Sequence, residues 1–458
     1  MPLGKEITDA TLATPHGTQA YHIVEKLMDA GFDAWWVGGC VRDMLLREIP
    51  KDIDIATDAL PEQIAKMFPK TNMTSADLGS VRVTMKNHLF EVTTFREDDA
   101  ASDGRHPESV AFGKRDDDAK RRDITINALY WHPISRELYD PFDGEADLKE
   151  RLIRFIGDPA IRIKHDALRL MRVVRFRAKL SGQYHPETYR ALQELAGLLE
   201  GLSGTRKLEE IEKILLGPHP DRAFEDLWEL GILPYVLPEL HACKGIPQPA
   251  DYHHEGDVWE HTMQCLRSFR EEDSVDVRIA ALFHDVGKAQ TFSLKERIRF
   301  DHHATVSAEL AEQALGRLQI EKKRREKISW IIKHHMMMGS FLDPSPSSGQ
   351  SMPEERKAHW YFHPWFAELL RLFYLDIAGT DPADFSLYQD ILDDYSQFLN
   401  THPRPEKPLL SGEEVMEILG IQPGEEVGKI LATLHDAQIR KKVTTKAEAR
   451  EFLKKERK

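Results

Sequence analysis

The sequence has 458 residues, of which 30% are charged and 41% hydrophobic, and this length predicts two to four domains. No apolar run is long enough to span a bilayer, the first residues lack a signal-peptide pattern, and the three cysteines show no metal-site spacing, so we expect a reducing cytoplasm and no disulfide framework. The net charge of −14 argues against a general nucleic-acid binder, although basic clusters, such as the one between Arg162 and Lys179, can still hold a phosphate backbone locally.

The first elements alternate between helix and strand. Apolar residues at helical spacing predict a helix over 16–30, with Gly31 as its cap. An apolar and aromatic run over 34–37 predicts a buried strand. A Gly-Gly pair then breaks the chain before a helix over 41–48, and alternating polar and apolar residues predict a strand over 52–57.

Asp52 and Asp54 stand one residue apart on this last strand, shortly after the glycine turn. Residues i and i+2 of a strand project to the same face, so we expect both carboxylates to meet the same pair of divalent cations. Two metals roughly 3.5–4 Å apart activate a hydroxyl and stabilise a leaving pyrophosphate. The backbone N–H groups of Gly38 and Gly39 can approach phosphates. A lone D-x-D pair is usually a solvated strand face, but the glycine turn favours a nucleotide-handling enzyme.

Further elements follow in the first half of the chain. Alternating residues over 81–85 and 89–95 predict a hairpin, and Glu91 on its second strand is a candidate third carboxylate. The charged stretch over 96–118 predicts a mobile loop. From about residue 148 the pattern is helical. One helix is expected to start at Asp158-Pro159 and continue to 180, which places Asp166 and Arg169 three residues apart on one face.

A histidine-rich region begins within residues 247–262 and runs to about Asp376. Its Pro/Ser-rich interruption, over 341–355, predicts a surface loop. Short helices are expected after Pro403. Two further basic clusters, over 322–325 and 446–458, are expected to be solvated helix faces.

Several motifs, in order, resemble the class II tRNA nucleotidyltransferases, which include CCA-adding enzymes and bacterial poly(A) polymerases. The resemblance covers roughly residues 31–240. The motifs are GGCVRD and DIDIAT, EVTTFR, SDGRHP, RRDITINAL, DPFDG and DALRLMRVVRF. The later pattern HEGDVWEHT, LFHDVGK and HH looks like the HD domain that some bacterial members carry behind the catalytic half.

The resemblance implies roles for the matching residues. Asp52 and Asp54 would be catalytic and hold Mg²⁺, with Glu91 as the third carboxylate. The implied nucleotide-binding residues are Gly38, Gly39, Arg42 and Asp43 for the triphosphate, Arg121, Arg122, Asp123 and Asn127 for sugar and phosphates, and Asp166 and Arg169 for the Watson–Crick edge of the base. We add Arg172 and Arg175 of the same basic segment to this set.

Base reading by Asp166 and Arg169 is chemically reasonable, because a carboxylate accepts from the exocyclic amine that C and A share. A simple helix salt bridge is the alternative interpretation. Two positions depart from the family pattern. His165 stands where the family usually has Glu, which weakens the inference about nucleotide preference, and Arg47 stands where it often has Gly, which changes the turn before Asp52.

The HD resemblance implies a divalent metal, either a transition metal or magnesium, held by the H…HD…D residues His261, His284, Asp285 and Asp376. His303 and His335 are candidates for a second metal or for phosphate binding. The implied chemistry is hydrolysis of a phosphomonoester or a cyclic phosphodiester.

The expected fold class is α+β. We predict a small mixed-sheet head of the polymerase-β-like type over 1–150, an all-helical neck and body over 151–240, an all-helical HD domain over 241–400 and a helical tail over 401–458. The favoured function is addition of C, A or both from CTP and ATP to the tRNA 3′ end, giving all or part of CCA. A poly(A) polymerase, an HD phosphohydrolase with a nucleotide-binding front half, and a non-catalytic RNA-binding protein are the alternatives.

Overall fold

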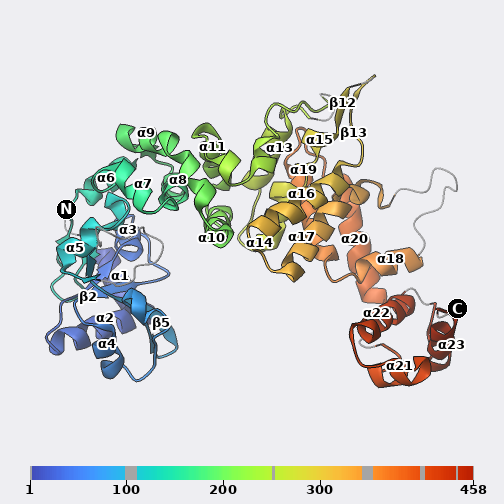
Figure 1. Ribbon diagram of the computed structural model, residues 1–458, viewed down its shortest axis with the longest axis horizontal. Helices are drawn as coiled ribbons and strands as arrows, with labels where there is room; N and C mark the ends of the chain where they lie inside the picture. Colours follow the sequence, from blue (N-terminus) through green and yellow to red (C-terminus); the bar gives the residue numbers. More distant parts are fainter. Residues whose placement is uncertain are drawn as a thin grey trace. The chain divides into compact units, whose positions relative to one another are not determined.

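The computed structural model describes residues 3–97, 111–249, 253–294, 296–342, 354–402, 408–439 and 442–456. The chain divides into two compact units, Met1–Pro238 and Glu239–Lys458 (Figure 1). The finer division into head, body, HD domain and tail stays a prediction. The SDGRHP motif lies outside the described residues, as do most of the loops predicted over 96–118 and 341–355.

Within the described part of the first unit, a seven-stranded mixed sheet has the order β3-β4-β5-β2-β1-β8-β9. Strand β1 is antiparallel to β2 and β8, while the central strand β2 runs parallel to β5. Strands β4 and β5 form the predicted hairpin. The strand bounds are β1 Ala34–Val37, β2 Asp54–Thr57, β3 Thr71–Asn72, β4 Ser80–Met85, β5 His88–Thr94, β8 Tyr130–Trp131 and β9 Leu138–Tyr139. A separate short pair joins β6 (Arg96–Glu97) and β7 (Ala111–Phe112).

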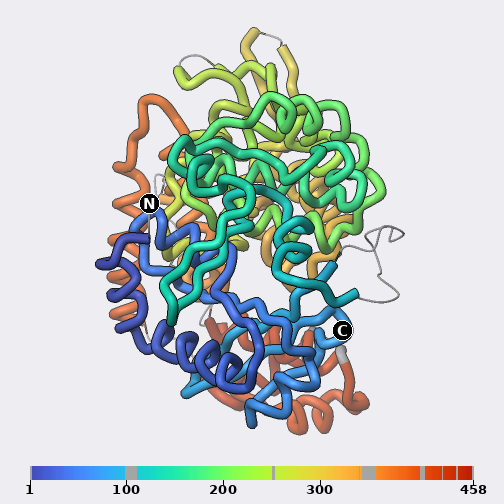
Figure 2. Tube along the Cα trace, turned by 90° about the vertical axis from the view of Figure 1, so that its left-hand side faces the viewer, coloured from blue at the N-terminus to red at the C-terminus, as the bar shows by residue number. Residues whose placement is uncertain are grey.

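The pleat of this sheet separates a packed face from the face that carries the polar site. Trp36, Ile55 and Val92 are cross-strand neighbours in the main hydrophobic core. The long helix α2 (Pro15–Asp29) packs against β1, β2 and β5 (Figure 2). The other head helices are α1 Lys5–Ala13, α3 Gly39–Leu45, α4 Pro61–Met67, α5 Arg115–Lys120 and α6 Gly144–Glu150.

The single helix predicted over 158–180 is wrong, because the chain breaks at Asp166. Helix α7 (Pro159–His165) ends there, and α8 (Arg169–Leu180) begins three residues later. Asp166 is extended, with φ −152° and ψ 105°, and its carboxylate accepts from Leu168 N at 3.1 Å. Such a local side-chain bond competes with the helix. Asp166 and Arg169 therefore do not share a helix face.

The remaining body is mostly rather than wholly helical, since β10 (Leu152–Ile153) and β11 (Gln183–Tyr184) form a short parallel pair. Helix α8 packs against α10 (Gly204–Leu215) and α11 (Pro220–Glu229). Helix α9 spans Pro186–Glu194.

The centre of the second unit is a helical bundle whose members are labelled in Figure 1. The bundle consists of α13 Val258–Arg267, α14 Val275–Phe283, α16 His303–Arg317, α17 Lys322–His334 and α19 Phe366–Ala378. It also carries an unpredicted hairpin of β12 (Phe292–Leu294) and β13 (Ile298–Phe300), so this region is not all-helical either. Further helices are α12 Pro238–His241, α15 Lys288–Thr291, α18 Glu354–Tyr361 and α20 Ser386–Thr401.

The tail has a hydrophobic core of its own. Leu410, Val415, Leu434 and Leu453 belong to it, and it joins three helices. These are α21 Gly412–Leu419, α22 Glu425–Ile439 and α23 Lys446–Glu456. Across the described ranges, no helix is long and apolar enough to cross a membrane.

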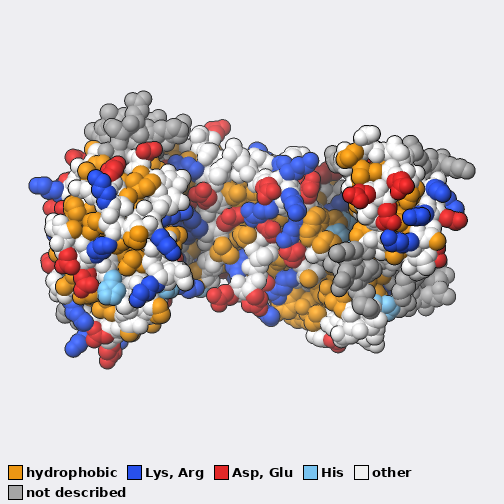
Figure 3. Space-filling model, turned by 90° about the horizontal axis from the view of Figure 1, so that it is seen from below, with side chains coloured by type: hydrophobic (Ala, Val, Ile, Leu, Met, Phe, Trp, Pro, Cys, Tyr) orange, Lys and Arg blue, Asp and Glu red, His pale blue; other side chains and the backbone are white. Residues whose placement is uncertain are grey.

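Within the basic cluster over 322–325, Lys322 and Lys323 are exposed, as expected of a solvated helix face, whereas Arg324 and Arg325 are half-buried in ion pairs with other helices. Arg324 lies 2.7 Å from Asp276, and Arg325 lies 3.5 Å from Glu312. On the face drawn in Figure 3, Lys and Arg side chains are likewise interspersed with Asp and Glu. Paired surface charges of this kind do not build a strong phosphate-binding field.

Candidate active site

A polar cavity of about 650 Å³ opens in the first unit between the sheet and α8. It brings together most of the predicted head residues. Those that line it are Gly38, Gly39, Arg42, Asp54, Glu91, Arg121, Arg122, Asp123, Asn127, Asp166, Arg169, Arg172 and Arg175. Asp43 and Asp52 are not among its lining residues, whereas the unpredicted Arg96 and Arg206 are.

Asp54 and Glu91 come from neighbouring parallel strands. Ile55 is paired with Val92, so one residue earlier Asp54 stands opposite Glu91 on the face that opens into the cavity. Ser80 Oγ donates to Glu91 Oε1 at 2.7 Å. Burial, followed by the charge of Glu91, raises the pKa of Asp54 from 3.8 to about 6. Two carboxylates that repel each other in this way suit a divalent cation between them.

Asp52 precedes β2 rather than lying on it, since the strand begins at Asp54. The predicted alternation is nevertheless present: Ile53 and Ile55 are buried in the core, whereas Asp52 and Asp54 face away from it. Asp54 is solvent-accessible but is enclosed by the walls of the cavity, which accounts for its raised pKa. Asp52 is close enough for its charge to add to the rise in the pKa of Asp54. Its role as a metal ligand stays a prediction.

The glycine turn is fixed by backbone geometry. Gly38 has φ 72° and ψ −119°, which L residues rarely adopt, and a Cβ there would lie 3.3 Å from Arg122 Nη1. Arg42 Nη1 donates to Asn127 Oδ1 at 2.7 Å, and its Nη2 donates to Asp43 Oδ1 at 2.9 Å. Asp43 therefore acts on the cavity through Arg42.

Asp118 is a buried carboxylate that the sequence analysis missed. It accepts from Arg121 Nε at 2.7 Å, Arg122 Nη2 at 3.1 Å and Tyr130 Oη at 2.6 Å. Burial alone would raise its pKa, but Arg122 and Arg121 hold the pKa of Asp118 at about 2. The spacing of three and four residues before these arginines was the available signal. Asp118 thus positions the guanidinium groups of Arg121 and Arg122, both of which line the cavity.

Asp123 fixes a second set of side chains. It accepts from Arg172 Nε and Nη2 at 2.9 and 2.7 Å and from Asn127 Nδ2 at 3.1 Å. Burial opposes its ionisation, yet Arg172 lowers the pKa of Asp123 to about 2. This carboxylate is therefore satisfied by protein donors and positions Asn127 and Arg172.

Asp166 pairs with a residue from another helix. Arg206 Nη2 on α10 donates to Asp166 Oδ2 at 2.8 Å, while Arg169 Nη1 donates to the backbone oxygen of Arg162 at 2.6 Å. The helix salt bridge considered as the alternative is thus not formed. Arg175, a further arginine of α8, lies 2.7 Å from Glu210 on α10. Nothing local in the sequence links positions 166 and 206.

A second cluster, in the other unit, brings together all four residues of the H…HD…D pattern. His261 Nε2 lies 3.2 Å from His284 Nε2 and 3.1 Å from Asp376 Oδ1. Asp285 Oδ2 lies 3.3 Å from His284 Nε2. The residues come from α13, the end of α14 and α19. We call this the HD centre.

His303 and His335 lie on the other side of Asp285. Their Nε2 atoms are 3.4 and 3.8 Å from its Oδ1 and 3.4 Å from each other. Neither carboxylate oxygen of Asp285 accepts a well-formed hydrogen bond within the described chain, although both are buried. A buried carboxylate facing four imidazoles fits one or two divalent metals.

Lys288 and Gln248 complete the HD centre and were not predicted. Lys288 Nζ lies 2.7 Å from Asp285 Oδ2 and donates to Gln248 Oε1 at 2.7 Å. Burial opposes the charge of Asp285, but His284 and Lys288 keep its pKa well below the usual range. An adjoining cavity of about 590 Å³ is lined by Asp285, Lys288 and Asp376, together with Arg297, Arg299, His303 and His335.

Three family models match the chain in order. The poly A polymerase head domain matches residues 34–154, the "probable RNA and SrmB-binding site of polymerase A" matches 183–244, and the HD domain matches 252–356. The head model covers Asp54 and Glu91 but not the cavity residues from Asp166 onward, and the HD model covers His261, His284 and Asp285 but ends before Asp376.

Relatives named CCA-adding enzyme match the chain over different shares of their length. The enzyme of Streptococcus pneumoniae serotype 19F is 33% identical over 365 residues, which is 73% of this chain and 91% of that protein. The chain belongs to the family of CCA-adding enzymes. The relative from Lactobacillus delbrueckii subsp. bulgaricus is 43% identical over 47% of this chain and 54% of its own length. The relative from Geobacillus stearothermophilus is 41% identical over 48% of this chain and 55% of its own length, so the chain spans about half the length of both.

Solved structures of the family share the fold. The CCA-adding enzyme of Bacillus stearothermophilus in complex with CTP has a TM-score of 0.65 at 27% identity, covering 97% of this chain and 98% of that one. The Thermotoga maritima CCA-adding enzyme complexed with tRNA, at 18% identity and a TM-score of 0.54, covers 99% of this chain and 98% of that one and supports the fold alone. The expected family and α+β class are therefore confirmed.

Proposed function

We propose that the chain adds C and A from CTP and ATP to the 3′ end of tRNA, forming all or part of CCA and releasing pyrophosphate. The observation that carries this proposal is the pairing of Asp54 and Glu91 in one cavity whose opposite wall is rich in arginine. The relatives named CCA-adding enzyme and the solved complex with CTP support it. Three free, buried cysteines suit a cytoplasmic protein.

The head carboxylates fit the divalent cations that this chemistry needs. Asp54 and Asp52, with Glu91 beside Asp54, would hold Mg²⁺, which supplies activation of the tRNA 3′-hydroxyl and stabilisation of the pyrophosphate when bound. The protein itself contributes the phosphate-binding side. Arg121 and Arg122, fixed by Asp118, and the backbone of Gly39 line the same cavity as Asp54, whereas Gly38 N, predicted to approach phosphates, already donates to Leu129 O at 2.9 Å.

Base selection belongs, in this proposal, to Asp166 with its partner Arg206, and to Arg169. The carboxylate of Asp166 accepts from the exocyclic amine of C or A, and a guanidinium donates to a ring nitrogen or carbonyl. U and G present a carbonyl where C and A present the amine, so the carboxylate repels them. The body helices would contact the tRNA through its shape and phosphates.

The test is tRNA ending at the discriminator base, at C or at CC, incubated with CTP, ATP or both. Product lengths then separate full CCA addition, C addition and A addition. Asp54→Ala should abolish incorporation while tRNA binding persists, and Asp77→Ala, an exposed carboxylate on η1 (Ala76–Leu78), should remain active. Long A tails would indicate a poly(A) polymerase. Binding without extension would reduce the head to a nucleotide-binding module.

We propose a second activity, phosphoester hydrolysis, for the HD centre. The supporting observation is Asp285, which is buried among four imidazole nitrogens and forms an ion pair with Lys288, with no well-formed hydrogen bond from the described residues. His261, His284, Asp285 and Asp376 would hold a divalent metal, with His303 and His335 available to a second, and such a metal supplies a hydroxide nucleophile. Arg297 and Arg299 line the adjoining cavity, where they can bind phosphate.

A further inference from the structure

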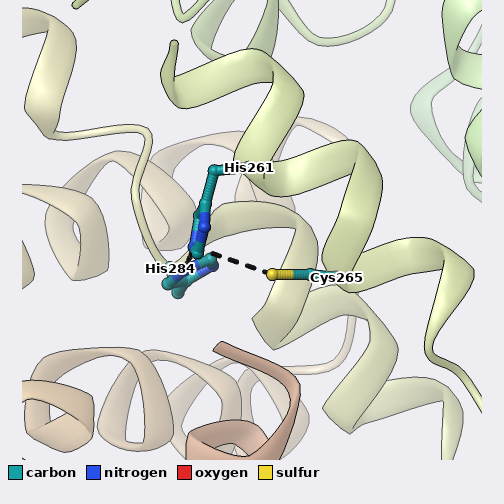
Figure 4. Close-up of side chains that lie close together, drawn as sticks. All are labelled: His261, Cys265 and His284. Carbon is teal, nitrogen blue, oxygen red and sulfur yellow. Dashed lines mark hydrogen bonds between the residues drawn. The ribbon is translucent and has the colours of Figure 1, made fainter. Parts of the chain in front are cut away.

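Cys265 lies within the HD centre, yet the hydrolytic chemistry proposed above does not use it. It stands one helical turn after His261 on α13, and its Sγ lies 3.7 Å from His261 Nε2 (Figure 4). Figure 4 shows both side chains directed toward the ring of His284. The ligand atoms of the three residues lie within 4.8 Å of one another, and all three residues are buried.

The hydrogen bonds of the two histidines leave the same ring nitrogen facing this cluster. His261 Nδ1 lies 3.1 Å from the carbonyl oxygen of Gly379, and His284 Nδ1 lies 2.8 Å from that of Ala281. A carbonyl oxygen only accepts, so each Nδ1 carries the hydrogen and each neutral ring has its lone pair on Nε2. Carbonyl contacts of this kind orient histidines that bind metals.

The separations match the edges of a four-coordinate metal site. With zinc–sulfur and zinc–nitrogen bonds of about 2.3 and 2.0–2.1 Å, tetrahedral angles put sulfur and nitrogen about 3.6 Å apart and two nitrogens about 3.3 Å apart. The observed separations are 3.7 Å from Cys265 to His261 and 3.2 Å between the two Nε2 atoms. Asp376 Oδ1, 3.1 Å from His261 Nε2, supplies the oxygen, and its side chain is 26% exposed. With Cys265 as the fourth ligand, Asp285 is available to the second metal beside His303 and His335.

Gly379, at the end of α19, leaves room for both side chains. A Cβ at this position would lie 2.3 Å from Cys265 Sγ and 3.1 Å from His261 Cε1. The first distance is shorter than any real Cβ contact, and the second is tighter than most. A larger residue would therefore displace the sulfur from the cluster, whereas glycine lets its own carbonyl oxygen reach His261.

We propose that Cys265 supplies a thiolate ligand to the HD centre, which therefore takes a thiophilic divalent transition metal such as Zn²⁺ in preference to Mg²⁺. The inference rests on the HD centre being the metal site proposed above. Thiolate and imidazole ligands favour zinc and similar metals, whereas Mg²⁺ requires oxygen ligands. Binding replaces the Sγ–H bond with a sulfur–metal bond and releases the proton to solvent, so affinity falls in acid.

Titration of the metal-free full-length chain with Co²⁺, a spectroscopic substitute for Zn²⁺, tests the proposal. We expect near-ultraviolet absorption from sulfur-to-cobalt charge transfer, together with visible bands from a four-coordinate ion. Cys265→Ala and Cys265→Ser should lose the near-ultraviolet band and bind Co²⁺ roughly tenfold or more weakly, by analogy with the loss of other metal-site contacts. Excess Mg²⁺ should not displace the cobalt.

Two matched cysteines provide controls, because Cys40 and Cys243 are also free and buried. Cys40→Ala and Cys243→Ala should keep the band. One outcome would refute the thiolate ligand alone: the unmodified chain shows visible cobalt bands but no charge-transfer band, and the visible bands vanish in His284→Ala. The HD centre would then still be the metal site. The same holds if the band survives in Cys265→Ala. Cobalt binding that is indifferent to His284→Ala would refute both the ligand and the centre.

Discussion

Arg47 occupies the left-handed region of backbone space, with φ 64°, in the exposed turn between α3 and β2. A residue with a Cβ is strained there, and the family often has glycine at the matching position. The turn leads directly to Asp52 and Asp54, so its geometry influences how the two carboxylates are presented. The presence of Arg47 where the family often has glycine therefore affects the backbone conformation of this turn.

Arg47→Gly should stabilise the protein. The left-handed conformation costs a side-chain-bearing residue roughly 1–2 kcal/mol, and the extra freedom of glycine in the unfolded chain offsets roughly 0.5–1 kcal/mol of this. We therefore expect the free energy of unfolding to rise by about 0.5–1 kcal/mol, measured by urea denaturation. Arg47→Ala is the control, since it removes the charge but keeps the Cβ; an equal gain there would mean that backbone strain is not the cause.

Asp54 carries an electrostatic cost in the metal-free protein, and Asp54→Asn should remove it. Its pKa of about 6 in the fold exceeds 3.8, so the folded chain binds the proton more tightly than the unfolded chain does. The destabilisation therefore develops as pH rises from about 4 to about 6 and is complete above that range.

The measurement is the thermal midpoint of Asp54→Asn and of the unmodified chain, with a chelator, between pH 4 and 8. We expect the variant to melt higher above pH 6, with the difference closing toward pH 4. Mg²⁺ should raise the midpoint of the unmodified chain more than that of the variant. A difference that is constant with pH would contradict the assigned cause, and Asp77→Asn should show none.

At the scale of secondary structure, the break between α7 and α8 shapes the side of the cavity that carries Asp166, the proposed base-reading residue. The apolar spacing of Leu168, Met171 and Val174 belongs to α8, and neither Gly nor Pro separates it from α7, so the sequence pattern does not mark the break. The hydrogen bond from Leu168 N to the Asp166 side chain ends α7 instead. The break frees Asp166 to meet Arg206 on α10, a contact between elements that a one-helix interpretation excludes.

Arg206→Ala should weaken base selection more than it slows turnover with the correct nucleotide. A hydrogen bond to a charged group contributes about 1.5–3 kcal/mol, so we expect discrimination of CTP and ATP against UTP and GTP to fall roughly 10–100-fold. Single-turnover incorporation of each nucleotide measures it. Arg206→Lys should restore part of the selectivity, and Arg222→Ala on α11 should change nothing. Unaltered selectivity in Arg206→Ala would show that Asp166 is positioned by other groups.

Over the whole molecule, the features predicted correctly from the sequence are those that depend on local residue patterns or on resemblance to the family. The alternation around Asp54 and the hairpin that carries Glu91 were visible in the residues themselves. The HD centre was found only through resemblance, because His261 and Asp376 lie far apart along the chain. Asp118 and Arg206 were missed since they act through other side chains, and such contacts depend on how helices pack.

The two centres lie in separate compact units, and none of the described residues lines both cavities. We therefore expect their activities to be separable. His284→Ala combined with Asp285→Asn should abolish hydrolysis of 2′,3′-cyclic nucleotides and p-nitrophenyl phosphate while nucleotide incorporation into tRNA stays unchanged. Asp54→Ala should do the reverse.

Because the HD double variant removes buried charge, it could also unfold the second unit. Asp376→Asn, at a partly exposed ligand position, is the milder companion, and thermal unfolding checks both. A large loss of incorporation in a folded Asp376→Asn protein would contradict independence and make the HD centre a part of tRNA extension. Loss of hydrolysis alone supports two enzymes in one chain, since neither set of ligands then depends on the other.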